Sequence, residues 1–170
     1  MFHSALTRRR EFTSIITTMA LTAVLLIGGA GTLSAQPTDK KALVGSWLGT
    51  VTFPPEFGRP PLRYVGSFHD DGTMVSSDQG GVTLDPPTVF SSFYGAWTHL
   101  EQRTFTYTGF ELISDLNGNL VGYLKARGVY TVSQSGNEYS GTTHAEILDA
   151  EGNLLFSVDV TNTADRMHVE

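Results

Sequence analysis

His144 and Glu146 are the two residues whose types and spacing best suit chemistry in this chain. Two residues apart on one strand, they would point to the same side of it, about 7 Å apart along the wall. An imidazole and a carboxyl in an apolar cavity could polarise a carbonyl group or move a proton, because burial shifts their pKa values. They could equally hydrogen-bond a ligand or bridge strands, so catalysis, binding and structure all stay open for this pair.

Other reactive patterns are weaker. His99, with Trp97 and Tyr130, is expected on the same inner wall, where packing is the commoner role for such residues. A metal site from His99, His144 and Glu146 would need side chains at different depths of the fold to converge, so we expect neither a metal nor a cofactor. The chain has no cysteine, which excludes disulfides, thiolate catalysis and Cys-ligated metals.

The chain begins with the features of an export signal. Three arginines, Arg8-Arg9-Arg10, precede an apolar run over 15–30, and a small-residue cleavage site ends at Ala35. Glu11-Phe12 after the arginines also resembles a twin-arginine signal, so the ordinary secretory route and the twin-arginine route are both open. The apolar run is short and interrupted for a membrane-spanning helix. We therefore expect a signal peptide over 1–35 and an exported protein, periplasmic or secreted.

The remaining residues, 36–170, form one acidic domain. Of the 11 Lys and Arg and 17 Asp and Glu in the chain, three Arg and one Glu precede residue 36, which leaves 8 against 16 and a net charge of −8. This charge is repelled by nucleic acid and by anionic membrane surfaces. We expect no nucleic-acid partner and no stable membrane insertion of this domain, which at its size can build a core without disulfides.

The same domain shows alternating apolar and polar residues, rich in Thr, Val, Tyr and Phe, which predict strands. Eight are expected, over 47–53, 62–69, 73–77, 93–100, 104–114, 120–132, 138–148 and 154–161. Short turns with Gly where a positive φ is needed, such as Asp70-Asp71-Gly72, join several of them. Consecutive strands joined by hairpins are neighbours in space. The fold class is therefore predicted as all-β, a single eight-stranded antiparallel up-and-down β-barrel, whose closure removes both edges.

Turn lengths predict which face of each strand points inward. Counting back from the turn after Asp149 places His144 and Glu146 on the same face as Phe156, and leaves the charged Glu111 on the opposite, solvent-facing side. Continued back to the turn at Glu101-Gln102, this register places the following candidate ligand-binding residues on the inner wall: Trp97, Thr108, Phe110, Leu124, Tyr130, His144, Glu146 and Phe156. Tyr64, on an earlier strand, is a further candidate ligand-binding residue. An eight-stranded barrel is wide enough to hold one small ligand, and small inner residues such as Gly128 favour such a hollow.

Strand direction predicts the open end of the barrel. The two long connections, 54–61 and 78–92, are rich in Pro and Gly and lie at one end together with the turns at 115–119 and 149–153. Long loops are where function concentrates, so this end is expected to be the mouth.

Short motifs give the chain a resemblance to the lipocalin and calycin superfamily. Gly45-Ser46-Trp47 at the first strand resembles that superfamily's Gly-x-Trp motif, and Arg166 follows the last strand. Together with Phe68–Thr73 and Gly95-Ala96-Trp97, the pattern resembles small exported bacterial lipocalin-like proteins. The resemblance implies that Arg166 packs over Trp47 at the closed end, as a cation–π contact. The usual lipocalin disulfide and flanking helix are missing here, and allene oxide cyclase-like and spirotetronate-forming cyclase barrels have a similar shape.

Three functions follow from this reasoning. The first is an exported barrel that binds a small apolar or amphipathic molecule in its interior. The second is a cyclase or isomerase that confines a flexible substrate, with His144 and Glu146 as candidate catalytic residues. The third is a structural envelope barrel with a filled core. A hollow or solid interior separates the third from the other two.

Overall fold

The computed structural model of this chain describes residues 39–79 and 86–169. The chain divides into two units, Met1–Ser34 and Ala35–Glu170, and all described residues belong to the second. The predicted signal peptide and its cleavage site therefore lie outside the described residues. Within these ranges, no helix has the length and apolar character that crossing a bilayer requires.

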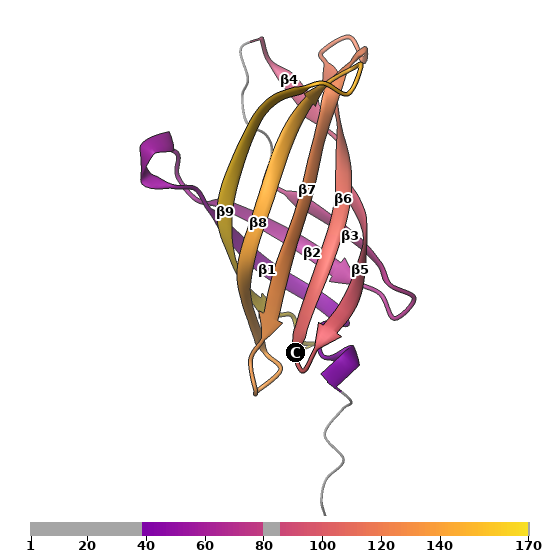
Figure 1. The fold of residues 1–170 in the computed structure, drawn as a ribbon, viewed down its shortest axis with the longest axis vertical. Coiled ribbons are helices and arrows are strands. Elements are labelled where there is room, and N and C mark those ends of the chain that lie inside the picture. The colour runs from indigo at the N-terminus through magenta and orange to yellow at the C-terminus, as the bar shows by residue number, and fades with distance from the viewer. Residues whose placement is uncertain (1–38, 80–85, 170) are drawn as a thin grey trace, which may run out of the picture. The chain divides into compact units, whose positions relative to one another are not determined.

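Eight strands close into an antiparallel up-and-down barrel (Figure 1), which confirms the predicted fold class. Each barrel strand pairs with the next along the chain, and the last pairs with the first. The strands of the described residues are β1 (Gly45–Thr52), β2 (Leu62–Phe68), β3 (Thr73–Asp78), β4 (Thr88–Phe90), β5 (Phe93–Glu101), β6 (Thr104–Asp115), β7 (Leu120–Val132), β8 (Glu138–Asp149) and β9 (Leu154–Arg166), with short 3-10 turns η1 (Asp39–Lys41) and η2 (Pro55–Phe57).

Among the strands of the described residues, only the short β4 was not predicted from the sequence. It lies within the long connection expected over 78–92 and pairs with β6, Phe90 opposite Ile113, beyond the point where β5 begins. Three residues are too few to show an alternating pattern, which explains the miss. β4 extends the barrel wall toward the mouth.

The wall is uneven around the barrel. The ladder between β3 and β5 covers only Thr73–Ser76 against Phe93–Ala96. The ladder between β6 and β7 runs from Thr104 to Ser114 along β6, and those between β7, β8 and β9 are as long. Figure 1 shows these long strands running the length of the barrel, with β1–β3 crossing them obliquely.

Each hairpin from β5 to β9 is offset by one residue from the register that turn lengths predicted. Ile147 lies opposite Phe156 because a β-bulge follows Ile147, and a second bulge follows Ile113 in the hairpin of β6 and β7. Both bulges adjoin a five-residue turn whose Gly has a positive φ, 84° at Gly118 and 89° at Gly152. The extra residue of a bulge moves every later side chain to the other face.

The offsets alternate in their effect. β9, β7 and β5 present the predicted residues to the interior, because two successive errors cancel, whereas β8 and β6 are turned inside out. The turn between β7 and β8 contributes because Val132 pairs with Tyr139, and the β5–β6 hairpin contributes through an irregularity between His99 and Glu101.

The closed end is packed around Trp47, which is fully buried. The Arg166 guanidinium lies 4.2 Å from the centre of the Trp47 ring, as the resemblance implied. Arg166 also donates hydrogen bonds to three backbone carbonyls, those of Ala42 (2.5 Å), Val44 (2.7 Å) and Gly136 (2.6 Å). One side chain thus joins the segment before β1, the β7–β8 turn and the end of β9.

Candidate functional site

A cavity of about 210 Å³ lies inside the barrel, with all nine described strands contributing to its wall. Phe53 and Arg59 of the β1–β2 connection also line it, which places its opening at the end with the long loops, as predicted. A cavity of about 150 Å³ lined by apolar side chains can hold benzene. This cavity therefore has room for a molecule of one or two rings.

Aromatic rings cover the glycines of the inner wall. A Cβ added to Gly49 would overlap the ring of Tyr64, its neighbour across the β1–β2 ladder. The same arrangement recurs for Gly128 under Tyr107 and for Gly141 under Tyr130. The missing side chains let the rings lie flat against the wall, as in other sheets where an aromatic residue covers a glycine. The hollow that small inner residues predicted is thus partly occupied by these rings.

Tyrosine hydroxyls form a polar patch on the cavity wall. The hydroxyls of Tyr64 and Tyr139 lie 2.5 Å apart, and that of Tyr107 lies 2.6 Å from Thr143 Oγ1, which donates to Asn162 Oδ1 at 2.7 Å. Burial raises the pKa of Tyr64 to about 12 and also raises the pKa of Tyr107 and Tyr139. These hydroxyls are therefore protonated and uncharged at neutral pH.

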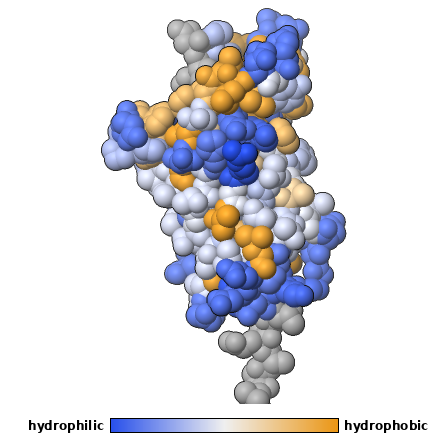
Figure 2. All heavy atoms as spheres, viewed as in Figure 1, coloured by the Kyte–Doolittle hydropathy of each residue, from blue (hydrophilic) through white to orange (hydrophobic). Residues whose placement is uncertain are grey.

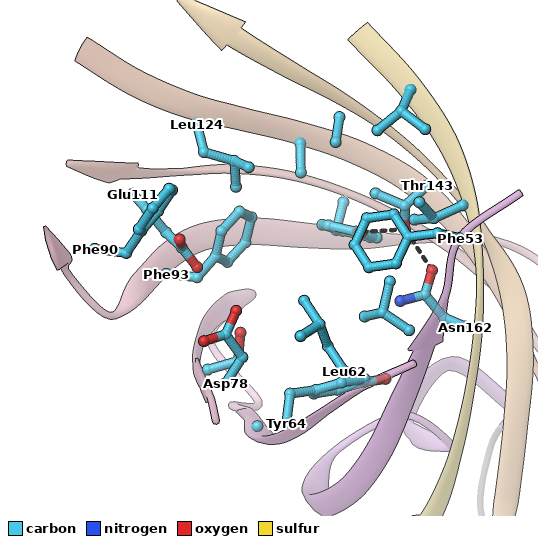
Figure 3. A pocket seen from close by; sticks show the side chains of 18 of the residues that line it. Phe53, Leu62, Tyr64, Asp78, Phe90, Phe93, Glu111, Leu124, Thr143 and Asn162 are labelled. Atoms are coloured by element: carbon cyan, nitrogen blue, oxygen red, sulfur yellow. Dashed lines mark hydrogen bonds between the residues drawn. The ribbon is translucent and has the colours of Figure 1, made fainter. Parts of the chain in front are cut away.

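Glu111 is the acidic side chain of the inner wall that sequence reasoning placed outside. It lines the cavity from β6 and is only 9% exposed. Burial raises its pKa to about 7, and the charge of Asp78 raises it as well. Figure 3 shows Glu111 with Phe90, Phe93 and Asp78 on one side of the cavity. The prediction that Glu111 faces water is wrong, because the β6 register is offset by one residue.

Five of the predicted binding residues do face the interior. Tyr64, Leu124, Tyr130 and Phe156 line the cavity. Trp97 lies deeper, at the closed end, where its ring contacts Phe105 at a centroid distance of 5.6 Å and its indole nitrogen donates to backbone carbonyls. Their contact with a ligand stays a prediction.

The other four predicted residues, Thr108, Phe110, His144 and Glu146, lie on the outer wall, so their predicted inward placement is wrong. The one-residue offsets of the hairpins turn β6 and β8 over, so that Tyr107 and Thr143 face inward in their place. Phe110 is accordingly 44% exposed.

On the outer wall, His144 and Glu146 belong to a surface network of charges. The carboxylate of Glu146 lies 3.3 Å from Lys125 Nζ, 3.5 Å from Arg127 and 3.4 Å from His144, whose other ring nitrogen is 2.7 Å from Asp159. Desolvation alone would raise the pKa of Glu146, but its hydrogen bond to Lys125 and the neighbouring cations hold it below its usual value. Figure 2 shows a hydrophilic patch on this face, with apolar side chains both nearer the mouth and nearer the closed end. From here, neither residue can act on a molecule inside the barrel.

His99, the third residue of the metal site considered from the sequence, makes contacts of another kind. Its ring contacts Phe105 at 5.4 Å, and its Nε2 is hydrogen-bonded to the Gln102 carbonyl at 2.8 Å. Among the described residues, no three His, Cys, Asp or Glu are grouped so as to hold a metal ion.

Comparison with known proteins gives no match, whether to a family model, to a curated protein or to a solved structure.

Proposed function

We propose that this protein is an exported, lipocalin-like barrel that holds a small apolar or amphipathic molecule in its interior. The observation that carries the proposal is the cavity of about 210 Å³, which opens at the long-loop end and is lined mainly by aromatic and aliphatic side chains. A concave apolar site with a few polar groups is the general form of a small-molecule site. A hollow of this size also favours binding over the filled-core alternative. The proposal that the protein is exported rests on the signal-peptide pattern of residues 1–35.

The expected affinity follows from the area that a guest would bury. An aromatic guest that buries about 200 Å² of apolar surface gains about 5 kcal/mol at 25 cal/mol per Å². Part of this gain is lost to the immobilisation of the guest. Apolar burial alone therefore supports weak binding, and the polar groups of the wall must supply the rest.

Two phenylalanines with nearly equal exposure test the site directly. Phe156 (45% exposed) lines the cavity at the mouth, and Phe110 (44% exposed) lies on the outer wall. We expect Phe156→Ala to weaken binding of the two-ring fluorescent probe 2-naphthol, neutral at pH 7, about tenfold, because the probe loses one face of its contact. Phe110→Ala should leave the dissociation constant unchanged in the same titration.

A second pair narrows the cavity rather than widening its mouth. Ala126 lines the cavity and is 6% exposed, whereas Ala96 of β5 faces outward. Ala126→Leu should reduce probe binding and Ala96→Leu should not, with thermal unfolding used to verify that both variants fold. Equal probe affinities in all four variants would reject the cavity as the binding site.

The second candidate function is an isomerase or cyclase, and Glu111 is the observation that favours it. A carboxyl with a pKa of about 7 in an apolar cavity is suited to proton transfer at neutral pH. We expect the protein to accelerate exchange of the α-hydrogens of 2-tetralone with D₂O, followed by mass spectrometry, and Glu111→Gln to remove the acceleration. Exchange no faster than in buffer alone would leave binding as the function.

A further inference from the structure

The carboxyl of Glu111 stands in a specific setting on the cavity wall. Tyr94 pairs with Phe110, so the register places Phe93 of β5 directly beside Glu111 of β6. Phe90 of β4 lies two positions further along the same wall, opposite Ile113. Asp78 closes the group at the end of β3, and its charge acts on Glu111. Two carboxyl groups and two aromatic rings thus share one side of the cavity (Figure 3).

Within the described residues, the side chain of Glu111 has no hydrogen-bond or ion-pair partner. An ionised carboxylate buried without a partner costs several kcal/mol. The nearby cations are engaged elsewhere: Arg59 lies 4.9 Å from the ring centre of Phe53, and Lys125 and Arg127 pair with Glu146 on the outer wall. No cation of the described residues therefore neutralises an ionised Glu111, and a positively charged guest in the cavity could do so.

The chemistry around Glu111 selects the kind of guest that could supply this charge. An ammonium group would be attracted by both carboxyl groups and by the faces of Phe90 and Phe93. An anionic guest would be repelled by the same carboxyls. The rest of the cavity is apolar and has room for one or two rings.

We propose that the cavity binds a small hydrophobic amine, with its ammonium group beside Glu111 and Asp78 and its apolar body against the aromatic wall. This inference rests on the proposed binding function and specifies the class of its ligand. It also gives Glu111 a role that neither packing nor the surface network explains.

Three probes of matched shape test the inference by isothermal calorimetry on the full chain: 2-phenylethylamine, the neutral 2-phenylethanol and the anionic 3-phenylpropionate. At pH 8 we expect the amine to bind at least about tenfold more tightly than the alcohol. Between pH 8 and pH 5.5 the amine should lose most of this tenfold advantage and bind about as tightly as the alcohol, because a carboxyl with a pKa of about 7 becomes protonated over this range. The other charged groups that line the cavity are Asp78 and Arg59, and its tyrosines stay neutral.

Glu111→Gln separates this carboxyl from those other groups. In this variant the amine should bind no more tightly than the alcohol, and its pH dependence should disappear, while alcohol binding is retained. Glu146→Gln makes the same change on the outer wall and should alter nothing.

The outcomes distinguish this inference from the function beneath it. If the alcohol binds and the amine binds no better, or if Glu111→Gln leaves the amine unaffected, the amine assignment is overturned while the binding function stands. Preferential binding of the propionate would overturn it in the same way. If none of the three probes binds, the binding function itself fails.

Discussion

Replacing Arg166 with methionine is expected to lower the free energy of unfolding by about 4 kcal/mol. The guanidinium donates to the carbonyls of Ala42, Val44 and Gly136 and lies over the Trp47 ring. Hydrogen bonds from a charged donor contribute about 1.5–3 kcal/mol each, and removing the donor leaves partly buried carbonyls unsatisfied. Methionine can replace only the apolar contact with the indole.

Urea unfolding of the full chain, followed by tryptophan fluorescence, measures this loss. Arg166→Lys should be intermediate, because lysine keeps the charge but cannot form the fork of hydrogen bonds. Arg127→Met on the outer wall is the matched control, and its exposed ion pair with Glu146 should contribute less than about 1 kcal/mol. An Arg166→Met variant no less stable than Arg127→Met would show that the closed end does not depend on this residue.

Replacing Glu111 with glutamine is expected to stabilise the protein at pH 8 by about 3 kcal/mol, which for a domain of this size raises Tm by about 10 °C. Burial raises the pKa of Glu111 to about 7, from the 4.5 that is usual for a glutamate in water. Below pH 4.5 the carboxyl is protonated in both the folded and the unfolded state, so it contributes nothing. Above this pH the unfolded state ionises first, and the stability of the wild type falls until the folded carboxyl ionises near pH 7.

Thermal unfolding at pH 5 and pH 8 tests this expectation without a ligand. The gain in Tm for Glu111→Gln should be small at pH 5 and nearly complete at pH 8. Glu146→Gln is the control with the opposite pKa shift, because a hydrogen bond to Lys125 and the neighbouring cations lower the pKa of Glu146. Removing the Glu146 charge should therefore not raise Tm. An increase in Tm that is equal at both pH values would mean that Glu111 does not titrate in this range.

The eight barrel strands, their order and the open end could be predicted from the sequence because each depends on local signals. Alternation defines a strand, and a short turn makes two strands neighbours. The contact between Arg166 and Trp47 came from the resemblance of two short motifs, and the structure places both residues as that resemblance implied. None of these features depends on knowing the exact pairing of two strands.

The identity of the inner face was harder to predict, because it depends on register. Asp149-Ala-Glu-Gly-Asn153 and Asp115-Leu-Asn-Gly-Asn119 are turns that carry an extra bulged residue, and counting through them without that residue inverts the neighbouring strand. Charge also predicted the outer face from Glu111, Lys125, Arg127 and Asp159; the last three do lie outside, and Glu111 does not. Charged side chains are rarely buried in proteins, and Glu111 is such an exception.

The composition of β6 held a second signal for its faces. In the first half of β6, Thr104, Thr106 and Thr108 alternate with Phe105 and Tyr107, which indicates that the odd-numbered residues face inward, whereas Phe110, Glu111 and Leu112 in the second half suggest the opposite. The pattern of the first half places Glu111 in the interior, in agreement with the structure. It also places Phe110 outside, whatever the turns suggest.

The unequal ladders of the wall give the barrel a weak seam. Where Thr73–Ser76 meets Phe93–Ala96, only a short stretch of backbone hydrogen bonds joins β3 to β5, next to the side of the cavity that carries Glu111. Local opening begins where the fewest bonds must break together. Backbone amide protons along this seam should therefore exchange with solvent first. The barrel wall should open locally between β3 and β5 while the β6–β9 ladders remain paired.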